Sequence, residues 1–421
     1  MKPKTDNVVL APGPLHLFWT AGAYYMWELS RKYNVVLVVD EIYRASQPFK
    51  KAAGLADVAD IVYVPAGNAF IRHRFYAREF KRVIKESRPK AIFHHDAVYV
   101  QMMYLYYWGR KFVPGMLRIS CLAGLATSYW DPVADFDAEL LAAKLHIPRA
   151  VARFLNETKG WLSMVLNYFI LPAVFAGKVF VPVMNITNGK ILKKYWNDQF
   201  DFFLLYSEAD QKSMGKWCGS TDGFVQVRHP LETAGREFNG RFYDIEEKAI
   251  VIIMPTYGLI NTYQKENNLS DKEIIDHVSD KWVEAITILR SKFPGYELVL
   301  KLHPSQERDM LWQKIVAEIK NACAGLTLVN PRENGQEWVL RSKVVVSDFS
   351  SVLWWAAFFD SKVAISLDIF GTRFSDEMKY RESVYYFNNL KDFAGAEFTR
   401  NRNKKPEGLP SLNNFLSGVM V

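Results

Sequence analysis

Short apolar runs alternate with longer stretches of helical periodicity through the first part of the chain. The apolar runs are predicted strands, and the stretches between them, with apolar residues every three or four positions, are predicted helices. The predicted strands cover residues 8–11, 35–39, 61–64, 90–93, 202–206 and 224–227, and the clearest helices cover 20–33, 69–87 and 208–217. Buried strands that alternate with helices indicate a parallel sheet covered on both faces, so a Rossmann-like domain is expected.

The same alternation starts again near residue 249. Strands are predicted at 249–254, 297–302, 326–329, 344–347 and 363–367, with helices over 271–292, 307–322, 335–341 and 351–359. The fold class is therefore α/β, with two doubly wound parallel sheets that are expected to face a cleft. We expect a first domain over 1–235, a second domain over 236–385, and a tail over 386–421 that crosses back to the first domain.

An apolar and helical middle segment, about 128–190, is predicted to be an insertion in the first domain. Its most apolar part, residues 160–177, contains Asn167 and Pro172 and is barely long enough to cross a bilayer. A buried helix or one that lies on a membrane surface is expected in preference to a transmembrane span. Residues 1–7 are polar and lack the apolar core of a signal peptide, so a cytoplasmic protein is expected, with peripheral contact to the inner membrane as an option.

The amino-acid composition indicates which classes of ligand the protein can bind. The net charge is +8 and the pI is about 9.1, which favours anionic ligands such as nucleotides or phospholipid headgroups. The basic residues are spread out and form no nucleic-acid-binding motif, so nucleic acid is not an expected partner. The three cysteines are far apart, which argues against a disulfide framework and a zinc site.

Three predicted strand ends in the second domain carry polar side chains. Ligands of open parallel sheets bind outside the carboxyl ends of the strands. The first end contains Thr256, the second reads Lys301-Leu302-His303-Pro304, and the third reads Ser347-Asp348-Phe349-Ser350-Ser351 directly before an apolar helix.

The second and third of these strand ends carry groups that can bind a phosphate. A helix N-terminus offers unpaired N–H groups to an anion, and Ser350 and Ser351 add hydroxyl donors; a simple N-cap is the alternative interpretation. Lys301 and His303 fall on one face of their strand, where a cation pair can hold a phosphate and histidine can protonate a departing one. A structural role for a histidine before proline is the alternative there.

The order Lys-x-His-Pro and then Ser-Asp-x-Ser-Ser resembles bacterial GT-B glycosyltransferases that use cytidine nucleotides. These families are the sialyl- and polysialyltransferases, the Kdo (3-deoxy-octulosonic acid) transferases and the CDP-glycerol polyol-phosphate transferases. The resemblance covers residues 250–371, with a weaker similarity over 225–232. It implies that His303, Ser350 and Ser351 contact the nucleotide phosphate, and that Asn330 and Glu337 lie near the base and ribose.

Within this group the whole-chain pattern looks most similar to the β-Kdo transferases. The first domain has no clean copy of the Asp/Glu-Asp/Glu-Gly motif of sialyltransferases. The junction reads Arg228-His229-Pro230-Leu231-Glu232, which differs from the Gly-x-Pro-Arg-x-x-Asp of the CDP-glycerol enzymes. The resemblance implies transfer of Kdo from a CMP-sugar to a cell-surface polysaccharide or lipid-linked glycan, with retention to a β-linkage. A CDP-polyol phosphate, sialyl or UDP-hexose transferase, and a non-catalytic glycan-binding subunit, remain alternatives.

Retention requires a carboxylate nucleophile, whereas inversion requires only a base. The candidates are Glu232 at the domain junction, Asp96 after the strand that ends in His94-His95, Glu157, Asp135 and Asp137. Asp96 is equally well explained as a helix cap. Asp135-Phe136-Asp137 resembles the metal-binding motif of a different glycosyltransferase fold but precedes a predicted helix. Because basic and hydroxyl groups surround the expected phosphate, no metal and no cofactor besides the donor substrate is expected.

Overall fold

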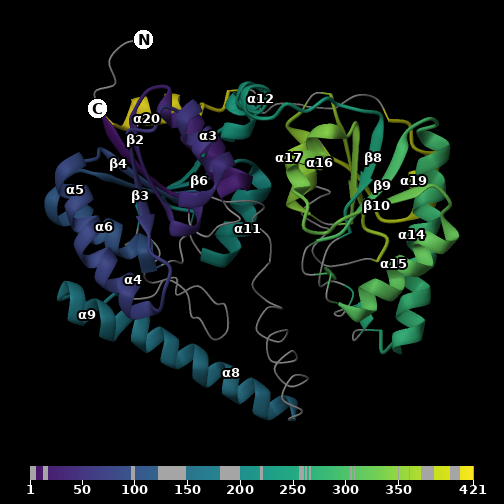
Figure 1. Cartoon of the computed structure of the whole chain (residues 1–421), viewed down its shortest axis with the longest axis horizontal. Helices are drawn as coiled ribbons and strands as arrows, with labels where there is room; N and C mark the ends of the chain where they lie inside the picture. The colour runs from purple at the N-terminus through teal and green to yellow at the C-terminus, as the bar shows by residue number, and fades with distance from the viewer. Residues whose placement is uncertain are drawn as a thin grey trace. The chain divides into compact units, whose positions relative to one another are not determined.

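The computed structural model of the chain divides into two compact units (Figure 1). Unit 1 comprises Met1–Phe242 and Gly408–Val421, and unit 2 comprises Tyr243–Glu407. The structure describes residues 6–12, 18–95, 100–121, 148–180, 200–218, 221–255, 260, 263–264, 267–303, 306–307, 309–348, 350–359, 361–370, 384–398 and 408–420.

Unit 1 contains a seven-stranded sheet in the order β3-β2-β1-β4-β5-β6-β7, and every pair of neighbours is parallel. The order reverses between β1 and β4, so the connections leave these two strands toward opposite sides. The strands are β1 (Asn7–Ala11), β2 (Asn34–Asp40), β3 (Asp60–Val64), β4 (Ala91–His95), β5 (Leu117–Cys121), β6 (Phe202–Leu205) and β7 (Phe224–Gln226).

Helices cover both faces of this sheet. All eight residues of α2 are buried. Short polar side chains start two of the others, because Ser46 accepts a hydrogen bond from the Phe49 N–H and Asn68 accepts one from the Ile71 N–H. The helices are η1 (Phe18–Gly22), α2 (Ala23–Ser30), η2 (Glu41–Ala45), α3 (Gln47–Leu55), α4 (Ala69–Phe75), η3 (Tyr76–Phe80), α5 (Lys81–Ser87), α6 (Val100–Phe112), α8 (Arg149–Met164), η4 (Val165–Ile170), α9 (Leu171–Ala176), α11 (Glu208–Cys218), α12 (Pro230–Phe242) and α20 (Leu412–Val419).

Unit 2 contains a six-stranded sheet in the order β10-β9-β8-β11-β12-β13, again with parallel neighbours throughout. Here the order reverses between β8 and β11. The strands are β8 (Ile250–Ile253), β9 (Glu297–Lys301), β10 (Leu326–Val329), β11 (Val344–Ser347), β12 (Val363–Leu367) and β13 (Tyr385–Phe387).

The longest helix of unit 2 is α14 (Asp271–Lys292), with 22 residues. A capping box starts it: the Ser270 side chain accepts from the Glu273 N–H, and the Glu273 carboxylate accepts from the Ser270 N–H. Trp282, in its middle, is 1% exposed and belongs to the core between α14 and the sheet. The other helices are α15 (Met310–Ala322), α16 (Gly335–Arg341), α17 (Ser351–Ala357) and α19 (Leu390–Gly395).

The predicted fold class is confirmed: the chain contains two Rossmann-like, doubly wound parallel sheets of the GT-B type. The sequence did not predict η2, α3, α6, β5, α12, β13, α19 or α20. Pro230 begins α12, because proline suits the first turn of a helix, where no N–H partner is needed.

The division between the units lies after Phe242, whereas 235 was expected, because α12 packs in unit 1. The Phe238 ring is 5.5 Å from that of Tyr24 and 5.7 Å from that of Trp27. The expected tail over 386–421 is shorter in the structure, since β13 pairs with β12 and stays in unit 2, and only Gly408–Val421 returns. Of the expected insertion, the structure describes 148–180.

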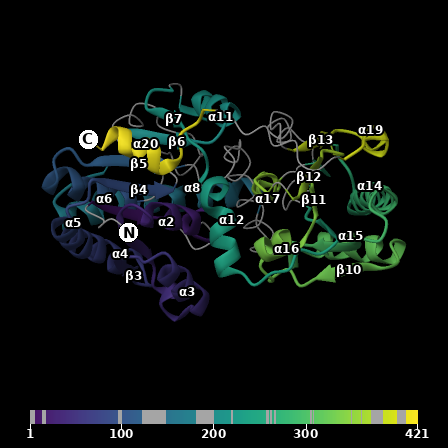
Figure 2. The ribbon, with the colours of Figure 1, turned by 90° about the horizontal axis from the view of Figure 1, so that it is seen from above.

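The returning segment packs on unit 1 through α20, drawn in yellow in Figure 2, which contacts α2 and β6. Leu412 and Leu416 are fully buried, and the Phe415 ring lies 5.3 Å from that of Phe202. The Asn413 amide donates a hydrogen bond of 2.7 Å to the carbonyl of Glu28. The last helix is therefore part of the core of unit 1.

We predict that Leu416→Ala lowers the free energy of unfolding by about 2–4 kcal/mol, because it removes a fully buried side chain and leaves a cavity. Urea unfolding followed by far-UV circular dichroism measures the change. Leu162→Ala is the matched control, since Leu162 is 66% exposed and its truncation should change stability by less than about 0.5 kcal/mol. Equal effects of the two substitutions would contradict this role of α20.

Candidate nucleotide site

The carboxyl ends of β9, β8 and β11 lie next to one another in unit 2, where the strand order reverses. Ile253 of β8 pairs with Leu300 on one side and with Val346 on the other, so the three strands end at nearly the same level. Neighbouring strands are about 4.8 Å apart, which puts the ends of β9 and β11 about 10 Å from each other. Connections diverge at this position, and ligands of doubly wound sheets bind at such a point.

Lys301 is the last residue of β9 and is only 4% exposed. Its Nζ atom donates to the carbonyl oxygens of Leu302 and Pro331, each at 2.7 Å. Burial lowers the pKa of Lys301 to about 8, and the negative charge of Glu333 opposes that shift. Lys301 therefore ties the end of β9 to the segment after β10.

His303 lies two residues further along and its side chain is exposed. Its backbone is fixed, because the His303 N–H donates to the Gln306 side-chain oxygen at 2.6 Å and the Gln306 N–H donates to the His303 carbonyl at 2.9 Å. Gln306 is itself fully buried. The turn thus holds His303 at the surface of the carboxyl edge, while Lys301 points into the interior. Pro304 lies outside the described residues.

Ser350 is the N-cap of α17. Its backbone is extended, with φ −161° and ψ 143°, and its Oγ accepts a hydrogen bond of 3.3 Å from the Val352 N–H. The hydroxyl hydrogen is not used by this bond, so Ser350 can cap the helix and still donate to a ligand. Ser351 is the first residue of α17, and its side chain lies outside what the structure describes. Thr256, after β8, also lies outside the described residues.

Hydroxyl groups connect the end of β11 to both of its neighbours. Ser347 bonds to the carbonyl oxygen of Met254 after β8, and Ser366 of β12 donates to the carbonyl oxygen of Asp348 at 2.8 Å. Asp348 is only 6% exposed. The sequence assigned no role to Ser347 or Asp348. A signal was present, since both are polar residues that directly follow a run of buried valines.

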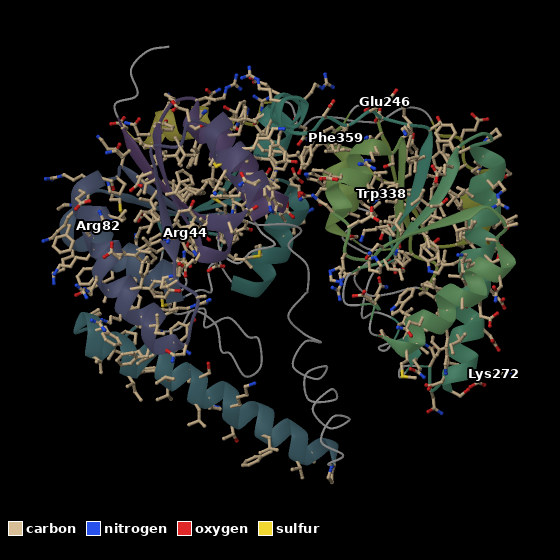
Figure 3. All side chains as sticks on the ribbon, viewed as in Figure 1. Arg44, Arg82, Glu246, Lys272, Trp338 and Phe359 are labelled. Carbon is tan, nitrogen blue, oxygen red and sulfur yellow. The ribbon has the colours of Figure 1, made fainter. Side chains whose placement is uncertain are left out.

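The two residues assigned to the base and ribose lie near the end of β10. Asn330 is exposed, and its side-chain oxygen accepts a hydrogen bond of 2.9 Å from the Arg332 N–H, which closes a turn. Glu337 is half-buried in the first turn of α16. Burial raises the pKa of Tyr243, and the negative charge of Glu337 adds to that shift. Figure 3 labels Trp338, the next residue of this helix, whose indole N–H donates to Glu333 at 2.9 Å.

In unit 1 the end of β4 is enclosed by protein. His94 and His95 are fully buried, and burial together with the neighbouring His94 lowers the pKa of His95 to about 3. The His95 ring packs edge-on against Tyr25 at 4.7 Å. A neutral, enclosed imidazole cannot reach an acceptor hydroxyl directly. Asp96, which follows, lies outside the described residues, as do Asp135 and Asp137.

Another buried histidine positions the start of α12. His229 lies 4.4 Å from the Tyr206 ring, and its Nδ1 accepts a hydrogen bond of 3.0 Å from the Leu231 N–H. Glu232 follows in the first turn of the helix, half-buried, with its N–H bonded to the His229 carbonyl at 2.9 Å. Because α12 follows β7, Glu232 lies at the carboxyl edge of the first sheet. Glu157 belongs to α8, and its side chain is not described.

Comparisons with known proteins give the fold. Neither models of protein families nor curated proteins match the sequence. Among solved structures, the chain is similar to UDP-GlcNAc 2-epimerase from Methanocaldococcus jannaschii, with a TM-score of 0.51, 9% identity, and coverage of 95% of this chain and 93% of that chain. It is also similar to UDP-GlcNAc 2-epimerase from Neisseria meningitidis bound to UDP-GlcNAc, with a TM-score of 0.50, 11% identity, and coverage of 92% and 89%. At this identity the likeness establishes the two-domain GT-B fold.

The buried Lys301 predicts a specific pH dependence of stability. Folding lowers the pKa of Lys301 from 10.5 to about 8, so between these values the unfolded chain binds the proton more tightly. The free energy of unfolding of the wild type, relative to Lys301→Met, should therefore rise by about 2 kcal/mol as the pH is raised from 8 to 10. Urea unfolding at a series of pH values measures the difference.

Lys320→Met serves as the control, because Lys320 is exposed on α15. Its stability should follow that of the wild type at each pH. If the Lys301→Met curve also runs parallel to the wild type from pH 8 to 10, the protonation of Lys301 is not coupled to folding.

Proposed function

We propose that this chain is a glycosyltransferase that moves an acidic ketosugar, with Kdo as the leading candidate, from a CMP-sugar donor to a cell-surface polysaccharide or lipid-linked glycan. The observation that carries the proposal is the placement of His303 and Ser350. They follow β9 and β11, the two strands that flank β8 at the reversal of strand order. With the resemblance of their motifs to enzymes that use cytidine nucleotides, this placement favours a phosphate bound between them.

His303 and Ser350 have the chemistry that a departing nucleotide requires. When the bond between the anomeric carbon and the phosphate oxygen breaks, the electron pair stays with the phosphate and its negative charge increases. An exposed imidazole on a fixed turn can donate a hydrogen bond or a proton to that oxygen. The hydroxyl hydrogen of Ser350 adds a second donor. Both contacts strengthen as charge develops, so they assist departure of CMP.

The sugar needs a second group, which we assign to unit 1. Loss of CMP leaves an oxocarbenium-like centre, and a carboxylate that attacks it forms a glycosyl-enzyme intermediate. Attack by an acceptor hydroxyl, which loses its proton to a base, then gives the β-linked product with retention. Glu232 is the leading nucleophile because it is half-buried at a sheet's carboxyl edge. Asp96 and Glu157 remain the other candidates.

A UDP-sugar enzyme is the second candidate function. Two proteins with similar structures are UDP-GlcNAc 2-epimerases, and one of them was solved with UDP-GlcNAc bound. An epimerase of this kind would use the same edge of the second sheet for a different base. A CDP-polyol phosphate transferase and a glycan-binding subunit are the further alternatives, and nucleotide preference separates all four.

The nucleotide preference of the protein tests the identity of the donor. It is measured with a panel of CMP, CDP, UDP and GDP, each by thermal shift and by calorimetric titration. We expect CMP to stabilise the protein selectively, by about 2.7 kcal/mol when its concentration is 100 times its Kd. His303→Ala should weaken CMP binding at least tenfold, since it removes a donor to a charged phosphate. Glu297→Ala, at the opposite end of the same strand, is the control and should bind normally.

The panel also separates the rivals. A preference for UDP would replace the CMP-sugar proposal by the epimerase-like one, and a preference for CDP would favour a polyol-phosphate transferase. No response to any of the four nucleotides would refute every enzymatic alternative.

Substitutions of Ser350 separate capping from phosphate binding. Ser350→Ala removes the cap of α17 and should lower the free energy of unfolding by about 1 kcal/mol. Ser350→Asp keeps a cap, because aspartate also accepts the Val352 N–H, and should leave stability nearly unchanged. Its negative charge should nevertheless abolish CMP binding by repelling the phosphate. Normal CMP affinity of Ser350→Asp, measured by calorimetry, would restrict Ser350 to capping.

A further inference from the structure

The helix formed by α8, η4 and α9 exposes large apolar side chains in a stripe along one side. Its segments have 16, 6 and 6 residues, so it is about 42 Å long. Figure 1 shows it as one rod along the edge of unit 1, below α4. Most of these exposed side chains lie three or four residues apart, and Thr158 and Lys159 are exposed between Leu155 and Trp161. The apolar ones are Val151, Phe154, Leu155, Trp161, Leu162, Val165, Leu166, Phe169, Ile170 and Val174.

This stripe is unusual for a solvated surface. The outward face of a helix on a globular protein is normally polar, and soluble monomers rarely expose large contiguous apolar patches. Leu162 and Val174 are each 66% exposed, and Trp161 is 54% exposed. The stripe continues onto the start of α4, where Phe70 and Ile71 are 53% and 46% exposed. The Phe70 ring lies 4.8 Å from that of Phe175 in α9, which joins the two helices at this point.

The opposite face of the helix is fixed to unit 1. Met164, Tyr168 and Leu171 are buried. In the middle of the helix, the Asn167 side-chain oxygen lies 3.1 Å from Nε2 of His73, whose Nδ1 lies 3.1 Å from the Tyr104 hydroxyl. These contacts direct the apolar stripe away from the domain.

The same contacts indicate whether this helix lies on a membrane surface or crosses the bilayer. Residues Thr158–Ala176 are long and apolar enough to span a bilayer, and 22% of that window is buried. A spanning helix would have to give up the bond between Asn167 and His73 and the packing of Tyr168 and Leu171. Because the helix is held to unit 1 through Met164–Leu171, it favours an orientation in the plane of the membrane surface.

Positive charge lies beside the stripe. Arg74 and Arg78 are exposed one and two turns after Phe70 on the same face of α4 and η3, and Lys159 and Lys178 are exposed on the long helix and just after it. None of these four has an ion-pair partner among the described residues. Arg82 of α5, labelled in Figure 3, differs because Glu79 and Glu86 neutralise it.

We propose that the stripe, together with Phe70, Ile71, Arg74 and Arg78, is a docking face for the surface of an anionic lipid bilayer. The apolar side chains enter the boundary between headgroups and acyl chains, with Trp161 at the level that aromatic side chains prefer. The arginines and lysines contact lipid phosphates. This inference goes beyond the proposed transferase activity and does not depend on it, since it concerns a face of unit 1 and requires no nucleotide.

Vesicle flotation of the full chain, without nucleotide, tests the docking face. We expect the protein to float with vesicles of equal parts phosphatidylcholine and phosphatidylglycerol, and less with phosphatidylcholine alone; added salt should weaken the binding. Leu162→Glu combined with Leu166→Glu should lower the partition coefficient at least tenfold. Arg74→Glu combined with Arg78→Glu should lower binding only to the anionic vesicles.

Ile42→Glu is the matched control, because Ile42 is 62% exposed on η2 of the same unit and lies outside the proposed face. It should bind like the wild type, and far-UV circular dichroism should show all variants folded. Absence of wild-type binding to both vesicles would overturn the proposal, as would unchanged binding of the leucine double variant. Resistance of the bound protein to alkaline carbonate would show a spanning helix. Self-association that the leucine substitutions abolish, without vesicle binding, would assign the face to a second copy of the chain.

Discussion

The described strands of both sheets pair only in parallel, and the central strands are buried on both faces; the placement of the polar side chains depends on that constraint. A strand in such a sheet is apolar along most of its length, so most of its charged and hydroxyl side chains lie at or near its ends. The reversal of strand order separates the connections at β1 and β4 in unit 1 and at β8 and β11 in unit 2. In unit 2 the candidate residues His303 and Ser350 follow β9 and β11, the two strands that flank β8 at this reversal.

The polar groups at the second edge have different roles. Lys301, Gln306 and Ser347 are buried, and their side chains satisfy backbone groups between neighbouring strands and turns. They fix the positions of the strand ends. His303 and Ser350 stand on the segments fixed in this way. A rigid inner layer would suit the proposed phosphate site, which must hold a charged group in one place.

The sequence predicted most of the strands because valine and isoleucine runs such as Val344–Ser347 have few alternatives to a buried strand. It missed β5, where Arg118 and Ser120 break the apolar run; in the structure the Arg118 guanidinium pairs with Asp201, far away along the chain. Because side chains alternate along a strand, Lys301 and His303 were predicted to lie on the same face of their strand. The sequence could not predict that one side chain turns inward and the other stays exposed, because the carbonyl of Pro331 that receives the lysine lies on another strand's connection. The cap formed by Ser350 depends only on adjacent residues, and local reasoning included it.

The return of the last helix to unit 1 affects the order in which the protein can fold during synthesis. A ribosome releases residues 1–242 long before Leu412 and Leu416, so the growing chain exposes the surface that α20 later covers. Unit 2 is continuous from Tyr243 to Glu407, and all its strands are available before the last helix emerges. Domains usually mature in the order of their synthesis. Here unit 1 is begun before unit 2 and completed after it, so the surface that Leu412 and Leu416 cover stays open until α20 has been synthesised.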